Sequence, residues 1–325
     1  MKLINLIKCI RRKRIYKKMI SHDVKQYIDH SCVFSENNLI ARIERDILVY
    51  SHIVEKGIAH KKFKVYFGKD IVCELSKHVC TYYEYVDKNK YIYDVGVSAL
   101  SKYIKYNRNN GVDVTGFAKL PSLEETDKEY IGINTMTAAE FFSKVNANFA
   151  DFSESRKSVR LYDEKSENIC ENEIYKILSL AKNAPSACNR QAVRVHVVQN
   201  EEFIKKVAEI QEGCKGFGEN AGVMFIITSD LNYYLPLERK IPMFDCGIYA
   251  MNLLYSIHYN KFAACILNGS MSKENEQKIK MLLEIKDNEM LASIIVMYKV
   301  KDDSEINVGV TMRRDARDVC RFSER

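Results

Sequence analysis

Three cationic side chains and a hydroxyl lie within five consecutive residues near the middle of the chain: Arg156, Lys157, Ser158 and Arg160. A cluster of this kind can hold a phosphate group or an electron-rich ring through charge-assisted hydrogen bonds. Short basic runs more often form solvated surface, so the cluster alone leaves both interpretations open.

A second polar motif follows the cluster after one predicted helix, at 171–182, and comes just before a strand-like run at 193–198. It has the form Pro-Ser-x-x-Asn-x-Gln, with the fixed positions Pro185, Ser186, Asn189 and Gln191. A turn of this composition presents backbone and side-chain amides in place of a hydrophobic face. This second motif favours a binding site over a plain basic surface.

Together the two motifs resemble the start of the flavin domain in the FMN-dependent nitroreductase family, which has Arg-x-Ser-x-Arg/Lys and, one helix later, Pro-Ser-x-x-Asn-x-Gln. The segment Asp245-Cys-Gly-Ile-Tyr-Ala-Met-Asn-Leu-Leu is similar to the family's long central helix. A fainter fourth element is the pair Arg313 and Arg314 near the C-terminus. The four elements occur in the family's order, over roughly half of the chain.

The resemblance implies roles for the basic cluster. Arg156, with Lys157 beside it, would bind the FMN phosphate, and Ser158 would donate a hydrogen bond nearby. Arg160 would approach the pyrimidine edge of the flavin, where a cation stabilises the anionic reduced ring. One of Arg313 and Arg314 would complete the phosphate site, with Arg314 preferred, although a surface basic tail is the alternative.

The resemblance also implies a composite site in a homodimer. The turn with Pro185, Ser186, Asn189 and Gln191 would reach the flavin of the other subunit. A turn after a predicted strand, at Asn268 and Gly269, would place a backbone N–H opposite flavin N5; a plain strand-to-helix turn is the alternative there. No side chain is assigned as a catalytic acid or base.

Helices and strands alternate from 171 to 300, with strands expected at 194–199, 223–228, 262–267 and 291–300 and a long helix at 243–259. That alternation by itself favours a doubly wound parallel sheet. The resemblance implies instead an α+β nitroreductase-like fold, with a mixed sheet flanked by helices. We follow the resemblance, because no Gly-x-Gly-x-x-Gly follows any strand.

The N-terminal part is predicted to be mainly helical. Asn37 and Asn38 can cap a helix that Gly57 would end in a left-handed conformation, and Thr137 opens a short helix through Phe149 with a capping box. We therefore expect a helical extension at 1–135 and an FMN-binding domain at 136–325. His52, Glu55 and Lys56 are either catalytic or a helix-terminal ion cluster.

Composition narrows the possible classes. The chain has 325 residues, 46% of them hydrophobic, a net charge of +7 and ten cysteines without Cys-x-x-Cys or zinc-type spacing. We predict no metal, no nucleic-acid partner and a reducing cytoplasm. The basic, periodically apolar residues 1–20 indicate either peripheral membrane contact or a solvated helix.

The predicted function is an FMN-dependent oxidoreductase with ping-pong transfer from NADH or NADPH to a small-molecule acceptor that the sequence does not identify. The alternative is a non-catalytic or partner-dependent flavin protein, docked by its N-terminal domain to a membrane surface or a biosynthetic complex. A third interpretation keeps the fold without FMN.

Overall fold

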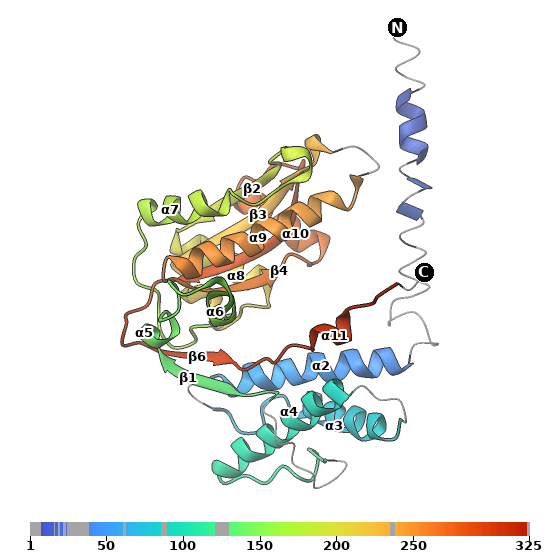
Figure 1. The fold of residues 1–325 in the computed structure, drawn as a ribbon, viewed down its shortest axis with the longest axis vertical. Helices are drawn as coiled ribbons and strands as arrows, with labels where there is room; N and C mark the ends of the chain where they lie inside the picture. Colours follow the sequence, from blue (N-terminus) through green and yellow to red (C-terminus); the bar gives the residue numbers. More distant parts are fainter. Residues whose placement is uncertain are drawn as a thin grey trace. The chain divides into compact units, whose positions relative to one another are not determined.

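The computed structural model of the protein describes residues 8–15, 17–18, 20–21, 24, 39–60, 63–85, 90–120, 130–234 and 238–323 (Figure 1). The chain divides into two compact units, which we describe separately. The sheet unit contains residues 135–306 together with 1–21, and the helical unit contains residues 22–134 and 307–325. The predicted division at 135 remains a prediction about domains; in the structure, 307–325 groups with the helices.

The helical unit is built on α2 (Leu39–Ile58), α3 (Lys69–Tyr83) and α4 (Lys90–Asn109) (Figure 1). Ile43, Ile47 and Val54 of α2 share one face at helical spacing and are buried. They pack in one core with buried side chains of α3 and α4, among them Leu75, Val79, Ile92, Leu100 and Tyr103. The predicted helical character of this part of the chain is confirmed.

Gly57 does not end α2 in a left-handed conformation as predicted. It lies inside the helix, where an added Cβ would be 1.9 Å from the ring of Phe67. The position needs glycine because an aromatic ring packs directly against the helix backbone. The predicted caps Asn37 and Asn38 lie outside the described residues.

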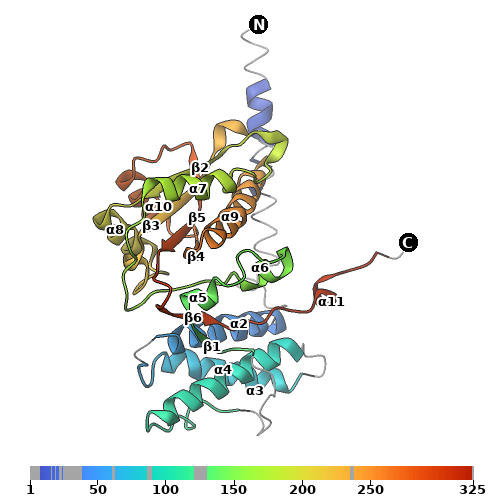
Figure 2. The ribbon, with the colours of Figure 1, turned by 60° about the vertical axis from the view of Figure 1, so that its left-hand side comes forward.

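The sheet unit contains a four-stranded sheet in the order β2-β3-β5-β4 (Figure 2). Its strands are β2 (Val193–Val198), β3 (Val223–Asp230), β4 (Ala263–Asn268) and β5 (Glu289–Tyr298). The two central strands are almost continuously apolar and buried, as expected of strands covered on both faces. The α+β fold class is confirmed.

The alternation of helices and strands alone would have given the wrong sheet. The three strand pairs, β2–β3, β3–β5 and β4–β5, are antiparallel. The expected mixed sheet is thus refined, since no parallel pair occurs in this sheet among the described residues. Helices and strands do alternate along the sequence, but each strand of this sheet runs antiparallel to the strands beside it.

Helices cover both faces of the sheet, with α9 and α8 on either side of β3 and β5 (Figure 2). The helices α7 (Glu171–Ala181) and α9 (Ile241–Tyr259) pack with one face of β3, which contributes Val223, Phe225 and Ile227. The helices α8 (Glu201–Gln211) and α10 (Lys273–Leu282) are joined by a hydrogen bond from the Asn275 amide to the Ile210 carbonyl, 3.2 Å.

Shorter elements precede the candidate site. The capping box of Thr137 and Glu140 is present, but α5 (Ala138–Phe141) ends well before Phe149, contrary to prediction. Asn148 caps a new helix, α6 (Phe149–Ser155), by accepting from the Asp151 N–H. β1 (Ile133–Thr137) pairs with β6 (Glu305–Gly309), and α11 (Ala316–Val319) follows.

In the N-terminal segment, residues 8–15 are helical and exposed. Among the described residues, no helix has the length and apolar character that crossing a membrane requires.

Candidate functional site

The basic segment, residues 156–160, begins where α6 ends. Arg156 caps that helix with extended backbone angles, φ −68° and ψ 112°. The Val159 N–H donates to the Ala264 carbonyl at 2.9 Å, which ties the segment to the outer edge of β4. Val159 is buried, so the alternation of an extended backbone directs Ser158 and Arg160 to the other side. The guanidinium of Arg160 lies 5.8 Å from the ring centre of Phe217.

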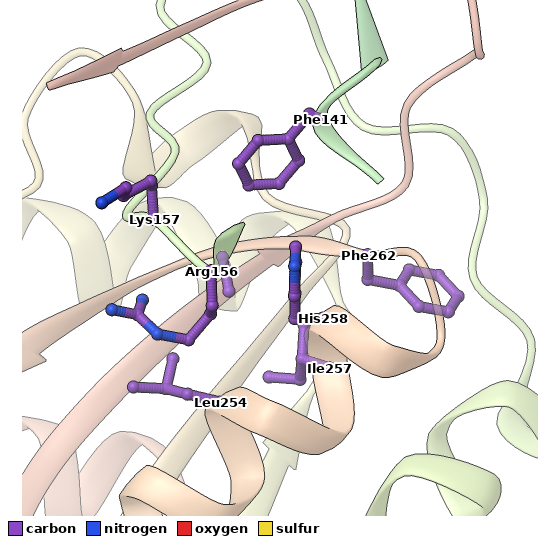
Figure 3. Close-up of a pocket in the computed structure, with 8 residues that line it drawn as sticks. Phe141, Arg156, Lys157, Leu254, Ile257, His258 and Phe262 are labelled. Atoms are coloured by element: carbon purple, nitrogen blue, oxygen red, sulfur yellow. The ribbon is translucent and has the colours of Figure 1, made fainter. Parts of the chain in front are cut away.

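A small pocket lies beside this segment (Figure 3). Its lining is two cations, one imidazole and apolar side chains: Phe141, Arg156, Lys157, Leu254, Ile257, His258, Phe262 and Ala264. The side chains of Arg156 and Lys157 extend to the same side, whereas Phe262 lies on the opposite side of His258 (Figure 3). The structure therefore combines two of the predicted cations at one pocket and adds residues from α5 and α9.

The imidazole of His258 is neutral at pH 7. The Ser155 hydroxyl donates to the Phe152 carbonyl at 2.8 Å, and because a hydroxyl has one hydrogen it accepts from His258 Nε2–H, also at 2.8 Å. Burial, and then the charge of Arg156, lowers the pKa of His258 to about 4. The rings of Phe141 and Phe152 lie 5.2 and 5.4 Å from the imidazole. The positive charge at this pocket thus comes from Arg156 and Lys157.

The turn, residues 186–191, unites Ser186, Asn189 and Gln191 as predicted from their spacing. The Ser186 hydroxyl accepts from the Gln191 N–H at 2.9 Å and closes the turn. Three of its residues have positive φ: Cys188 (51°), Asn189 (53°) and Gln191 (51°). Pro185, Asn189 and Gln191 are exposed, so their polar groups face outward. The turn leads directly into β2.

At the end of β4, the backbone N–H of Gly269 is not free to face a flavin, contrary to prediction. The Gly269 N–H donates to the Ala292 carbonyl at 3.1 Å, and an added Cβ would lie 2.5 Å from that oxygen. This amide is therefore occupied within the sheet and is not available to a ligand. The predicted position of Asn268 beside flavin N5 stays a prediction.

Comparison with known proteins tests the resemblance. Residues 154–214 match the model of the nitroreductase family, and this range includes both the basic segment and the turn. The predicted resemblance to the nitroreductase family is confirmed.

Two relatives, from Archaeoglobus fulgidus and Methanothermobacter thermautotrophicus, each bear the name "Putative NADH dehydrogenase/NAD(P)H nitroreductase". The first is 28% identical over 156 residues, which is 46% of this chain and 84% of the relative. The second is 27% identical over 144 residues, 43% of this chain and 71% of the relative. A solved FMN-dependent nitroreductase from Clostridium difficile is 19% identical with a TM-score of 0.44, and the match covers 53% of this chain and 98% of that one. At the family level, the family match and the two relatives support a general oxidoreductase function.

The C-terminal arginines of the nitroreductase-like pattern lie in the helical unit. Arg313 and Arg314 are exposed, and the guanidinium of Arg314 lies 5.6 Å from the ring centre of Tyr91. The Tyr91 hydroxyl donates to the Met312 carbonyl at 3.0 Å. Their predicted part in phosphate binding stays a prediction.

The cluster around Glu55 is an ion and hydrogen-bond cluster that fixes the C-terminal segment. The buried Glu55 carboxylate accepts from the Thr311 hydroxyl at 2.9 Å and the Thr311 N–H at 3.3 Å, and His52 Nδ1 lies 3.6 Å away. Burial raises the pKa of Glu55, but the hydrogen bonds from His52 and Thr311 outweigh it and the pKa is lowered. These contacts favour the structural interpretation over a catalytic one.

Sequence reasoning missed His258 and Phe141, which complete the pocket. His258 follows Leu254 by four positions on a helix that was predicted, so the two share a face. That spacing could have placed His258 near the pocket. Nothing local could have paired it with Ser155, which is 103 residues earlier.

Proposed function

We propose that the protein is an FMN-dependent oxidoreductase of the nitroreductase type, which transfers electrons from NADH or NADPH to a small-molecule acceptor. The observation that supports it best is the content of the family match: residues 154–214 include both the pocket cations and the polar turn. The two relatives' printed names, which include NAD(P)H nitroreductase, agree with this donor.

The residues present suit FMN. Arg156 and Lys157 offer two cations at one pocket, as a phosphate requires. The neutral His258 separates them from the apolar wall. Arg160 is half-buried on the segment that contains Arg156, which suits a cation for the pyrimidine edge of the ring. When bound, FMN supplies the hydride acceptance and return that this class of reaction needs.

The chain's own contribution is binding, orientation and charge. Arg156, Lys157 and Ser158 would hold the phosphate end, while Arg160 would stabilise negative charge on the reduced ring. The turn with Ser186 and Asn189 would supply polar contacts. No acid or base side chain is assigned, and a donor and an acceptor would use the pocket in turn.

We further propose a homodimer with composite sites, in which the turn serves the partner's flavin. The helix α9 is apolar around most of its circumference, yet Phe244, Met251 and Tyr259 on it are exposed. A helix that is apolar on all sides is normally covered on all sides. A second copy related by a two-fold axis would cover this face and complete two sites at once.

Subunit exchange tests the composite site. Arg156→Ala and Asn189→Ala proteins are mixed under conditions that exchange subunits, and bound flavin is measured. Heterodimers regain one intact site and about half of the wild-type flavin if the two residues serve different chains' sites. Recovery of none, with exchange confirmed, would show that both residues serve one chain's site.

Flavin bleaching tests the catalytic proposal. The purified protein is loaded with FMN and mixed anaerobically with NADH or NADPH, and the loss of the yellow flavin absorbance is followed. We expect bleaching by at least one donor and return of colour with an acceptor. A protein that binds FMN but is not bleached supports the non-catalytic alternative; one that binds no FMN overturns the proposal. Cytoplasmic location and peripheral membrane contact stay predictions.

A further inference from the structure

The turn holds an unfavourable backbone conformation. Cys188, Asn189 and Gln191 adopt φ of 51°, 53° and 51°, and none of them is glycine. Asparagine tolerates this left-handed region, but cysteine and glutamine rarely enter it. Such conformations persist where the surrounding structure enforces them, and they are concentrated at functional sites.

One enforcing contact is a buried carboxylate. Asp245 of α9 is 1% exposed. It accepts from the Ala187 N–H at 3.1 Å through one oxygen and from the Tyr234 hydroxyl at 2.9 Å through the other. The Ser229 hydroxyl, in turn, donates to the Tyr234 oxygen at 3.1 Å. The turn is thus joined to α9 and β3 through a chain of hydrogen bonds in which every donor has an acceptor.

The arrangement requires a carboxylate and a protonated phenol. Burial raises the pKa of Tyr234 to about 12, so the phenol keeps its proton at neutral pH. An asparagine at 245 would have only one acceptor oxygen, so its amide N–H₂ would face either the Ala187 N–H or the Tyr234 hydroxyl. If the amide N–H₂ faced the Ala187 N–H, two donors would oppose each other. If it faced the Tyr234 hydroxyl, that hydroxyl would have to accept instead of donate, and the hydrogen bonds along the chain would change direction.

A second contact holds the far side of the turn. The Arg190 guanidinium binds the Glu238 carboxylate through two hydrogen bonds of 2.8 and 3.0 Å. It also donates to the Ala187 carbonyl at 2.9 Å and lies 4.8 Å from the ring centre of Tyr234. Ala187 is therefore held at both its N–H and its carbonyl, one residue before the left-handed stretch begins.

We propose that Asp245 and Tyr234 are positioning residues, which hold the turn in its left-handed conformation so that Asn189 and the neighbouring amides face the ligand. The inference rests on the proposed function, because the ligand it concerns is the flavin. It adds that affinity for the flavin depends on two side chains that do not touch it. Asp245 and Tyr234 determine the conformation of the turn. They are therefore needed whether the turn contacts the flavin of its own subunit or of the partner.

The test compares Tyr234→Phe, Asp245→Asn and the control Tyr233→Phe, whose hydroxyl belongs to an exposed side chain. FMN affinity is measured by flavin fluorescence, and hydrogen exchange of 186–191 is measured without FMN. We expect about tenfold weaker binding for Tyr234→Phe, which removes one hydrogen bond to the carboxylate, and a larger loss for Asp245→Asn, which disturbs both. Exchange of the turn should rise about tenfold in both, with no change in the control.

A rescue separates positioning from general damage. Glycine adopts positive φ at little cost, so Cys188→Gly in the Asp245→Asn background should recover at least threefold of the lost affinity. Added to the wild type, the same substitution should raise affinity by a smaller factor than in the Asp245→Asn background, because the turn is already held there. A merely destabilised protein would show a lower melting temperature without this recovery, which would overturn the inference.

The outcomes distinguish this inference from the proposed function. If the wild type binds no FMN, the proposed function fails, while the exchange of 186–191 still tests the positioning pair. If the wild type binds FMN and both variants bind and exchange as it does, the positioning role is wrong. Should Asp245→Asn fail to fold, Arg190→Lys replaces it, since this change removes the paired bonds to Glu238 and the bond to the Ala187 carbonyl but leaves Asp245 and Tyr234 in place; we expect about threefold faster exchange. Unchanged exchange in both Tyr234→Phe and Arg190→Lys overturns the inference.

Discussion

The basic segment and the turn are both polar motifs of the sheet unit, but they are held in different ways. The basic segment is extended and is tied to β4 by a backbone hydrogen bond from Val159 to Ala264. The turn contains three left-handed non-glycine residues and depends on Asp245, Tyr234 and Arg190. Extended backbone is open to every residue type, whereas a left-handed residue costs about 1–2 kcal/mol. The basic segment is therefore held by a backbone hydrogen bond, whereas the turn is held by side chains that are distant in the sequence.

The largest expected effect concerns the charge on the basic segment. Arg156→Ala should weaken FMN binding by about 1.5–3 kcal/mol, or roughly ten- to hundredfold, because it removes a charge-assisted contact to phosphate. Titration of flavin fluorescence measures the affinity. Lys206→Ala is a control, since Lys206 pairs with Glu202 on exposed surface. Equal affinity of the Arg156 variant and the control would remove Arg156 from the site.

The next prediction concerns His258, which lines the pocket together with Arg156 and Lys157. Its pKa of about 4 in the folded protein lies below the ordinary value of about 6.5, so the unfolded chain binds the proton more readily between these values. Stability should therefore fall as pH drops from about 6.5 toward 4, by about 2 kcal/mol at pH 5.

Urea unfolding at pH 7 and pH 5 measures this loss, with His258→Gln as the comparison. The variant should lose about 2 kcal/mol less than the wild type over that interval. The pKa values of Glu55 and Glu289 are also lowered, but both groups are present in the two proteins, so their effect cancels. Identical pH dependence in the two proteins would contradict the prediction.

The backbone tie predicts an effect of similar size, about 1–3 kcal/mol. Val159→Pro removes the N–H that bonds Ala264 and leaves a buried carbonyl unsatisfied. Val159→Ala keeps the N–H and loses only packing, so the difference in unfolding free energy between the two variants isolates the tie. Equal stability would mean that the segment is not held by its backbone.

The smallest effect is expected within the turn. Ser186→Ala removes the acceptor for the Gln191 N–H and should cost about 0.5–1.5 kcal/mol, seen as weaker FMN binding and faster exchange of 186–191. Ser186→Thr keeps a hydroxyl and should resemble the wild type. If alanine and threonine behave alike, the hydroxyl does not close the turn.

The same contrast explains how far the sequence could predict the structure. The helix predicted before Gly57 is α2, whose Ile43, Ile47 and Val54 share the buried face, and the strands expected at 223–228 and 291–300 are β3 and β5. These elements could be predicted because a periodic or continuous apolar pattern reports directly on burial. Gly57 was misassigned because the ring that requires it belongs to Phe67, ten residues later and outside the helix.

The site divides in the same manner. The spacing of Pro185, Ser186, Asn189 and Gln191 predicted one turn, but not that Asp245, 58 residues beyond Ala187, would hold it. Gly269 was expected to offer its N–H to a ligand, whereas strand pairing with β5 uses that N–H. The local pattern of polar residues can indicate which groups could bind a ligand. Only the tertiary contacts determine which of those groups remain available to it.

The return of residues 307–325 to the helical unit has a consequence for protein synthesis. The helices α2 to α4 are made before the sheet, but Glu55 receives two of its hydrogen bonds from Thr311, and the Gly132 carbonyl accepts from the Val310 N–H. The segment 135–306 leaves the ribosome with its own sheet and helices complete, whereas the helical unit lacks these contacts until residues 310 and 311 have been added. During translation the helices α2 to α4, which are made before the sheet, therefore gain these contacts only after the sheet has been made.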